Sequence, residues 1–233
     1  MMLLVLLVAA LSFMISASAG LGGSLLLVPS LCLILGPKQG IALAALLLGC
    51  NNIAKVAAYR STIPLRAVGG VFVLTLLGAG LGARLLVKAP EFLIHAAILV
   101  SLGASFLFER KGLDRTRQRA APVLAFLAGA SSGFSGTSGP LKGIALRNLD
   151  LDRLHLVGAA SVVSLAGDAI KTAIFAQASL LTSTSLLILL AALPLMPMAA
   201  LAGHRLNQRI GERAYACLFW TVMTGYGMRL VFF

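Results

Sequence analysis

The 233-residue chain carries only 11% charged residues, whereas 59% of its residues are hydrophobic and its mean hydropathy is +0.99. A soluble domain usually carries about 25% charged residues, so a fully water-exposed surface is excluded and lipid is the expected solvent. The formal net charge of +12 is concentrated in short loops between apolar segments. Such loops set orientation by the positive-inside effect and favour anionic lipid head groups, and nucleic acid is not an expected partner.

Nine apolar segments follow one another along the chain, at 2–19, 23–35, 40–59, 67–86, 91–108, 121–146, 154–176, 186–203 and 214–232. A membrane-spanning helix needs about 20 residues, and several segments reach this length alone. The first two are separated only by a glycine-rich break, so we interpret them as one interrupted element. The segment 121–146 is interrupted in the same way. The sequence therefore predicts an all-α, polytopic helical membrane protein with eight membrane elements.

The two halves of the chain resemble each other. A shift of 116 residues superposes a glycine, a polar residue and a lysine of each half, in the pairs Gly20/Gly136, Asn52/Asp168 and Lys55/Lys171. A shift of 121 residues superposes Arg84 on Arg205 and Glu91 on Glu212. One insertion near 177–185 reconciles the two shifts. We therefore predict two homologous halves of about four membrane elements each, with a glycine-broken first element in each half.

The predicted organisation is an N-terminal transmembrane repeat at 1–108, a basic connecting loop at 109–120 and a C-terminal transmembrane repeat at 121–233. Repeats of this kind are typical of secondary transporters, whose binding site lies between the repeats near the membrane midplane. If each broken element spans the membrane, the repeats are parallel. If each is re-entrant, the basic loops share one side, which the charge distribution favours. The matched loop pattern gives a slight preference to parallel repeats, and both topologies stay open.

The first group of candidate binding residues lies in the two glycine-rich breaks. A break at membrane depth frees backbone groups and directs the partly positive N-terminus of the next half-helix into a polar cavity. Close packing of helices through small residues is the alternative, but two breaks at equivalent positions favour anion binding. The candidates are Gly20, Gly22, Gly23 and Ser24 in the first break, and Ser135, Gly136, Thr137, Ser138 and Gly139 in the second.

The second group consists of polar residues inside apolar segments, namely Asn51, Asn52 and Lys55 in the first half and Asp168 and Lys171 in the second. Residues three apart share one helical face, and a charge at the bilayer centre costs about 2.5–3.5 kcal/mol. Such residues therefore face a partner or a wet pathway. Asp168 can neutralise Lys171, which leaves Lys55 as the charge that receives an anion. Snorkelling of Lys55 to the interface is the alternative.

An intramembrane serine hydrolase and an ion channel are the alternative functions. The run from Gly133 to Gly136 resembles the G-x-S-G of rhomboid-like proteases, with Ser135 as the nucleophile. The first half has Ala17-Ser18-Ala19-Gly20 at that place, which favours an architectural break over catalysis. The three cysteines are far apart and form no CxxC, and no metal-ligand cluster or phosphate-binding loop is found in the sequence. We therefore expect neither a cofactor nor a metal, and no enzymatic activity.

Both breaks resemble the sulfite exporter TauE/SafE family of membrane permeases. The resembling stretches are Gly20-Leu21-Gly22-Gly23-Ser24-Leu25-Leu26-Leu27-Val28-Pro29 and Gly133-Phe134-Ser135-Gly136-Thr137-Ser138-Gly139-Pro140-Leu141. The similarity also covers the length, the duplicated four-helix layout and the central basic loop. Ser24 stands where a third glycine is typical, and Ser138 and Lys142 stand in a stretch that relatives often keep glycine-rich and apolar.

This resemblance implies a multi-pass permease of the plasma (inner) membrane. It implies transport of sulfite, a sulfonate such as sulfoacetate or a related sulfur compound, coupled to a proton or sodium gradient. Combined with the candidate residues, it predicts alternating access at a midplane site between the two repeats. The expected partners are a small anionic solute and the lipid bilayer, and the sequence does not specify an oligomeric state.

Overall fold

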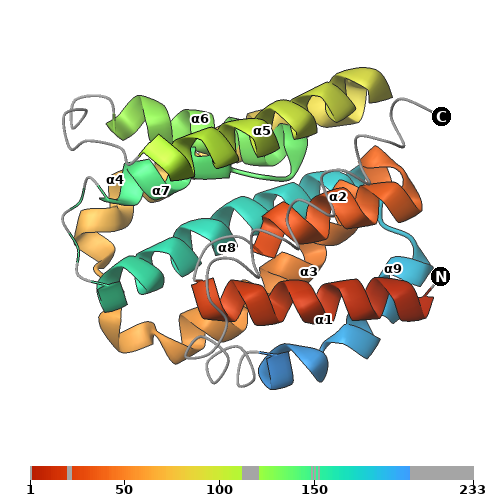
Figure 1. Cartoon of the computed structure of the whole chain (residues 1–233), viewed down its shortest axis with the longest axis horizontal. Coiled ribbons are helices and arrows are strands. Elements are labelled where there is room, and N and C mark those ends of the chain that lie inside the picture. The colour runs from red at the N-terminus through yellow and green to blue at the C-terminus, as the bar shows by residue number, and fades with distance from the viewer. Residues whose placement is uncertain are drawn as a thin grey trace.

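The computed structural model describes residues 2–19, 23–111, 121–147, 149, 151 and 153–199, in which every regular element is a helix. The helices form one bundle, in which they lie roughly parallel or antiparallel to one another (Figure 1). Three of them are long and apolar enough to cross a membrane, at Pro37–Ala57, Leu65–Lys88 and His155–Gln177. The predicted all-helical fold is therefore confirmed. The predicted segment 214–232 lies outside the described residues.

The predicted segments at 2–19, 23–35, 40–59, 67–86, 91–108 and 154–176 correspond to helices with small shifts at their ends, 121–146 forms two helices, and the helix in 186–203 ends at Ala192. In chain order the elements are α1 (Met2–Ala19), α2 (Gly23–Leu35), α3 (Pro37–Ala58), the 3-10 turn η1 (Arg60–Thr62), α4 (Leu65–Lys88), α5 (Glu91–Lys111), α6 (Ala121–Ser135), α7 (Gly139–Arg147), α8 (Arg153–Gln177) and α9 (Ser183–Ala192). Helix α5 continues through 109–111, so the predicted connecting loop begins as helix. Helix α9 ends before Pro194, which has no backbone N–H to donate.

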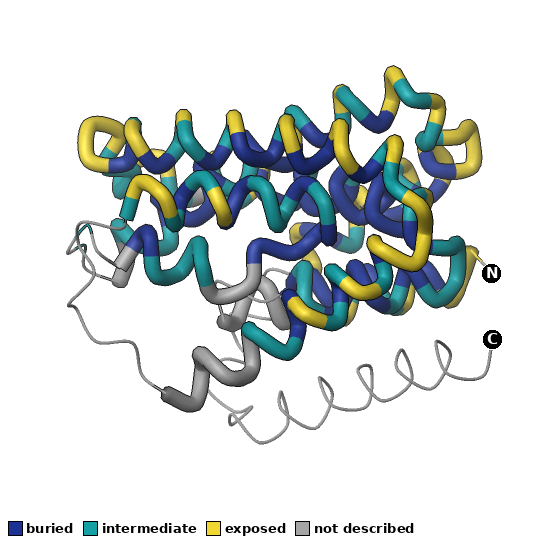
Figure 2. Tube along the Cα trace, turned by 90° about the horizontal axis from the view of Figure 1, so that it is seen from above, coloured by how far each residue is buried: buried dark blue, intermediate teal, exposed yellow. Residues whose placement is uncertain are grey.

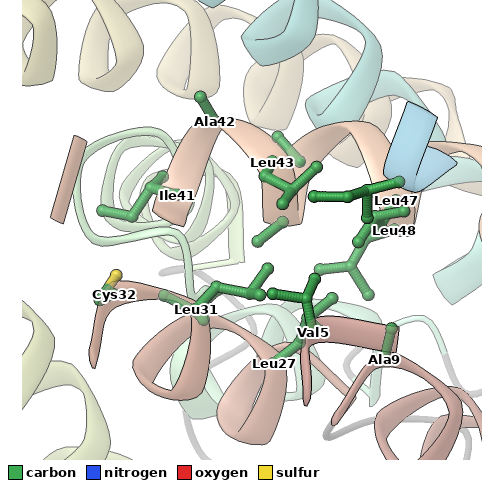
Figure 3. Close-up of a cluster of buried hydrophobic side chains, with 14 of the residues drawn as sticks. Val5, Ala9, Leu27, Leu31, Cys32, Ile41, Ala42, Leu43, Leu47 and Leu48 are labelled. Atoms are coloured by element: carbon green, nitrogen blue, oxygen red, sulfur yellow. The ribbon is translucent and has the colours of Figure 1, made fainter. Parts of the chain in front are cut away.

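The helices on the two sides of each glycine-rich break run in opposite directions. Helices α1 and α2 contact each other and run antiparallel (Figures 1 and 3). Helices α6 and α7 do the same, because Ala125 near the start of α6 shares an apolar cluster with Ala145 and Leu146 near the end of α7. The helices of 2–35 and those of 121–146 are therefore two antiparallel pairs, the arrangement that the re-entrant alternative predicts.

Two apolar cores lie at different levels of the bundle. The larger one joins α1, α2 and α3 to the last turns of α4 and α8, and Figure 3 shows Val5 of α1 beside Leu27 and Leu31 of α2. The smaller one joins the first turns of α4 and α8 to α6 and α7. Along α8, Val163 belongs to the smaller core and Phe175 to the larger one. The stretch between them, 164–171, is the place where polar residues enter the interior.

The outer surface of the bundle is apolar. On α4 the side chains of Val73, Leu77, Leu81 and Leu85 are each roughly half exposed and recur every four residues, so they form one outward stripe. Figure 2 shows such exposed positions alternating with buried ones along the helices. A soluble monomer rarely exposes apolar stripes of this length. The stripe is the surface that lipid chains would cover.

Helices α4 and α6 approach each other more closely than side chains would permit. A Cβ added at Gly78 would lie 2.8 Å from the backbone nitrogen of Ala130, and a Cβ added at Gly129 would lie 2.9 Å from that of Ala79. Gly82 and Gly133 repeat these contacts one turn further along. Both helices therefore contribute a GxxxG pattern, which allows backbone-to-backbone packing in membranes. The two helices run in the same direction and form a tight pair.

This packing predicts that Gly78→Ala destabilises the protein. The added methyl group has backbone atoms as neighbours, and overpacking of this kind costs about 1–3 kcal/mol. Thermal unfolding of the detergent-solubilised protein would show a lower Tm. Gly70→Ala is the matched control, because it lies on the same helix with nothing within 4 Å of an added Cβ. Equal Tm values for the two variants would contradict the proposed packing.

Candidate functional site

The two halves of the chain meet where α3 crosses α8. The side-chain amide of Asn52 donates a hydrogen bond to Oδ2 of Asp168 over 2.8 Å, and both side chains are buried. Gly49 lies beside this bond, and a Cβ there would lie 3.5 Å from Cβ of Asp168, an ordinary van der Waals distance. Further along, Gly158 of α8 lies beside Thr62 of η1, which directly follows α3. Residue numbers along α3 therefore rise where those along α8 fall, so α3 and α8 are antiparallel.

Asp168 also forms an ion pair within α8. Nζ of Lys171 lies 2.7 Å from Oδ1 of Asp168, and it donates a second hydrogen bond over 3.0 Å to the hydroxyl of Ser132 on α6. The Lys171 side chain is only 1% exposed. Both carboxylate oxygens therefore have a donor, one from each half of the chain. The expectation that Asp168 can neutralise Lys171 agrees with this geometry, and a direct role of Lys171 in binding stays a prediction.

Lys142 was missed as a candidate site residue, although it lies next to this ion pair. Its ammonium group donates a hydrogen bond over 2.7 Å to the hydroxyl of Ser164, which donates in turn to the carbonyl of Ala160. Ser164 lies one helical turn before Asp168, on the same face of α8. Lys142 also lies within electrostatic range of Asp168 and Lys171. The available signal was a basic residue in the first turn of the short helix that follows the second break.

Lys55 approaches the same region from α3. It lies one turn after Asn52, and because the helices are antiparallel this is the level of Ser164 on α8. Lys142 and Asp168 both lie within electrostatic range of Lys55. Among the described side chains, Asp168 is the only buried carboxylate. The cluster formed by Lys55, Lys142, Asp168 and Lys171 therefore contains three ammonium groups and one carboxylate, and we call it the lysine cluster.

The second break is held by its own hydroxyl groups. Gly136 has φ +76°, a conformation that favours glycine, and a Cβ there would lie 2.9 Å from Cγ1 of Val28. The carbonyl of Thr137 accepts hydrogen bonds from the hydroxyls of Ser131 at 3.0 Å and Ser135 at 3.2 Å. The Thr137 hydroxyl contacts that of Ser101 on α5. These hydroxyls therefore satisfy backbone groups that the break leaves without helical partners.

The break and the lysine cluster are adjacent through α6. Ser131 donates a hydrogen bond to the break, and its neighbour Ser132 accepts one from Lys171, so α6 links the two. Ser138 is buried, Gly139 begins α7, Gly23 begins α2 and Ser24 is half-buried. The predicted candidates Gly20 and Gly22 lie outside the described residues.

The side-chain amide of Asn51 is a further hydrogen-bond donor near these residues. Its side chain is buried, and its amide nitrogen makes no hydrogen bond within the described part of the chain. A buried amide without a partner costs about 1–3 kcal/mol, so it is a candidate for a ligand contact. The predicted constellation of Asn51, Asn52, Lys55, Asp168 and Lys171 thus falls on the crossing helices α3 and α8.

The geometry offers no support for a hydrolase at Ser135. Its hydroxyl contacts the carbonyls of Ser131 and Thr137 and the Thr137 hydroxyl, all within or beside the break. A nucleophilic serine needs a base within hydrogen-bond reach, and none is among these partners. Within the described ranges, no three His, Cys, Asp or Glu side chains gather as metal ligands would.

These features define a helical membrane protein with a charged cluster between two hairpin-containing parts. The chain belongs to the sulfite exporter TauE/SafE family, whose model matches residues 4–230. The resemblance seen in the two breaks is therefore confirmed over nearly the whole chain. Family membership implies a membrane transporter of sulfite or a related sulfur compound. Comparison with curated proteins and with solved structures gave no match.

The buried ion pair predicts a specific pattern of stabilities. Asp168→Asn leaves the Lys171 charge buried without its carboxylate, and breaking a buried pair in this way costs about 3–5 kcal/mol. The double variant Asp168→Asn/Lys171→Met removes both charges and should recover much of the lost stability. Thermal unfolding of the two variants in detergent tests this. A double variant that is less stable than the single one would contradict the assigned pair.

Proposed function

We propose that the protein is a multi-pass permease of the plasma membrane that carries a small sulfur oxyanion, namely sulfite, a sulfonate or a related compound. The single observation that carries this proposal is the lysine cluster, in which Lys55 and Lys142 lie beside an ion pair that already uses Asp168. An excess of ammonium groups in a low-dielectric interior favours an anion as counter-charge. Family membership supplies the sulfur chemistry.

The donors around the cluster suit the oxygens of such an anion. Ammonium groups and the amide of Asn51 are hydrogen-bond donors, and the oxygens of sulfite and sulfonate are acceptors. Hydrogen bonds between ionised partners are stronger than those between neutral groups. We assign Lys55 and Lys142 to direct contact with the anion, and Asn52, Asp168 and Lys171 to the floor of its site.

Alternating access would follow from two inverted repeats. Asn52 and Asp168 are 116 positions apart, the same shift that superposes the halves, and they touch each other. Equivalent residues meet in this way where a two-fold axis passes, and the antiparallel course of α3 and α8 supports an axis in the membrane plane. This arrangement is opposite to the slight preference for parallel repeats from the sequence.

Each of the two bodies that move during transport would contain helices from both halves of the sequence. Helix α4 of the first half is locked against α6 of the second, and α9 of the second half contacts α1 of the first. We therefore propose that α4 moves with α6, and α1 with α9, while the contact between α3 and α8 opens and closes. Asp168 lies at that contact, where a coupling proton or sodium ion would act on it.

The distribution of basic residues supports an orientation. Helices α3, α5 and α7 end, and α4, α6 and α8 begin, at one end of the bundle, on the left in Figure 1. Arg60 and Arg66 lie there, and Lys111, Arg147 and Arg153 terminate helices there. By the positive-inside effect we propose that this end is cytoplasmic. The Ser164 side of the cluster faces the same end.

The proposal predicts that Lys55→Ala strongly lowers the uptake of radiolabelled sulfite into proteoliposomes. Removing one partner of a desolvated charge contact costs about 2–5 kcal/mol, so we expect uptake to fall at least about tenfold. Lys38→Ala is the control, because Lys38 donates to the carbonyl of Val87 and lies about 25 Å from Lys55 along α3. Wild-type uptake should saturate and should be inhibited by sulfoacetate and thiosulfate.

Two outcomes would count against this function. Normal uptake by correctly inserted Lys55→Ala protein would contradict the anion role of Lys55. A wild-type flux that rises linearly with sulfite concentration, without saturation, would indicate a channel in place of a permease.

A further inference from the structure

Lys142 gives the lysine cluster a charge that the Asp168–Lys171 pair does not use. Oδ1 of Asp168 contacts Lys171, and Oδ2 accepts a hydrogen bond from Asn52. The short-range partner of Lys142 is the neutral hydroxyl of Ser164. Within the described part of the chain, the ammonium of Lys142 therefore has a hydrogen bond but no carboxylate within ion-pair distance.

Lys142 and Lys55 lie on the same side of Asp168. Ser164, which binds Lys142, lies one turn toward the N-terminus of α8, and Lys55 lies at that level on α3. The two lysines are within electrostatic range of each other. Like charges repel at this range in a low dielectric. An anion bound between the two lysines would relieve this repulsion and would contact one lysine from each half of the chain.

From this placement we infer that the site selects doubly charged oxyanions over singly charged ones, and that Lys142 is the residue that sets this selectivity. The inference rests on the proposed anion site and deepens it. A second negative charge costs more desolvation than the first, so a site with one cation would prefer a monoanion. A second cation from α7 reverses that preference.

Lys142 also lies in the first turn of α7, where the partial positive charge of the helix end adds to that of its side chain. Both positive charges act beside α8, because the chain reverses at Gly136 and α7 runs back toward the start of α6. Sulfite and sulfoacetate carry two charges when fully ionised. The inferred substrate class is therefore an oxyanion of this charge, of small size.

The test uses two ligands of the same shape that differ by one charge. Sulfoacetate has a sulfonate and a carboxylate, whereas sulfoacetamide has the sulfonate and a neutral amide. Titration calorimetry of the full chain in lipid nanodiscs would give both affinities for wild type, Lys142→Met and Lys142→Arg. We expect wild type to bind sulfoacetate at least about tenfold more tightly, a difference of about 1.4 kcal/mol. We expect Lys142→Met to lose this ratio and Lys142→Arg to keep it.

Each other outcome contradicts a defined part of the account. If wild type binds the two ligands equally, or if Lys142→Met retains the full ratio, the charge selectivity is wrong while the anion site stands. If Lys38→Met loses the ratio as Lys142→Met does, the effect is not specific to the cluster and the inference also fails. If folded wild type binds neither ligand, the proposed anion site itself is contradicted, and the selectivity with it.

Discussion

The placement of one buried carboxylate constrains the interior of this protein. Asp168 lies between two apolar cores, and a charge at this depth is tolerated only with partners. It takes one donor from α3 and one from its own helix, so the crossing of α3 and α8 cannot slide without losing the bond to Asn52. Lys171 is in turn held by α6. The contact between the two halves is therefore a polar one, surrounded by apolar packing.

Small residues set the packing of the helices around this polar contact. The glycines of α4 and α6 bring those helices into backbone contact. Gly136 adopts a left-handed conformation that reverses the chain and lets the short helix α7 return beside α8. The hydroxyls of Ser131 and Ser135 then satisfy the carbonyl of Thr137. Residues close together in the sequence therefore both reverse the chain and satisfy the backbone groups that the reversal exposes.

Much of the fold was predictable, because long apolar segments and their polar breaks are local properties. The boundaries of α1 and α2 agree with the predicted segments, and Asn52 and Asp168 were identified as one polar group from their shared shift. The course of the chain at each break was not predictable in the same way. A glycine-rich stretch is compatible with a kink or a reversal, and the presence of Ala125 and Leu146 in one apolar cluster decides between them at the second break.

The role of Lys142 depended on a contact that no spacing reveals. Its first-half counterpart under the shift of 116 is Leu26, so the repeat gave no signal. The partner Ser164 is 22 residues away, on another helix. Asn51 and Ser132 are similar cases, since only the three-dimensional arrangement distinguishes them from other small polar residues in membrane helices. The sequence therefore indicated the polar residues at the crossing of α3 and α8. The structure adds Lys142, which lies on one side of that crossing.

The most direct test of the account is a cryo-electron microscopy map of the protein in nanodiscs with sulfoacetate at saturating concentration. The account predicts ligand density in contact with the ammonium groups of Lys55 and Lys142, with the Asp168–Lys171 pair intact beneath it. Density at another place in the bundle, with those two side chains unchanged from the map without ligand, would contradict the central claim that the lysine cluster is the anion site.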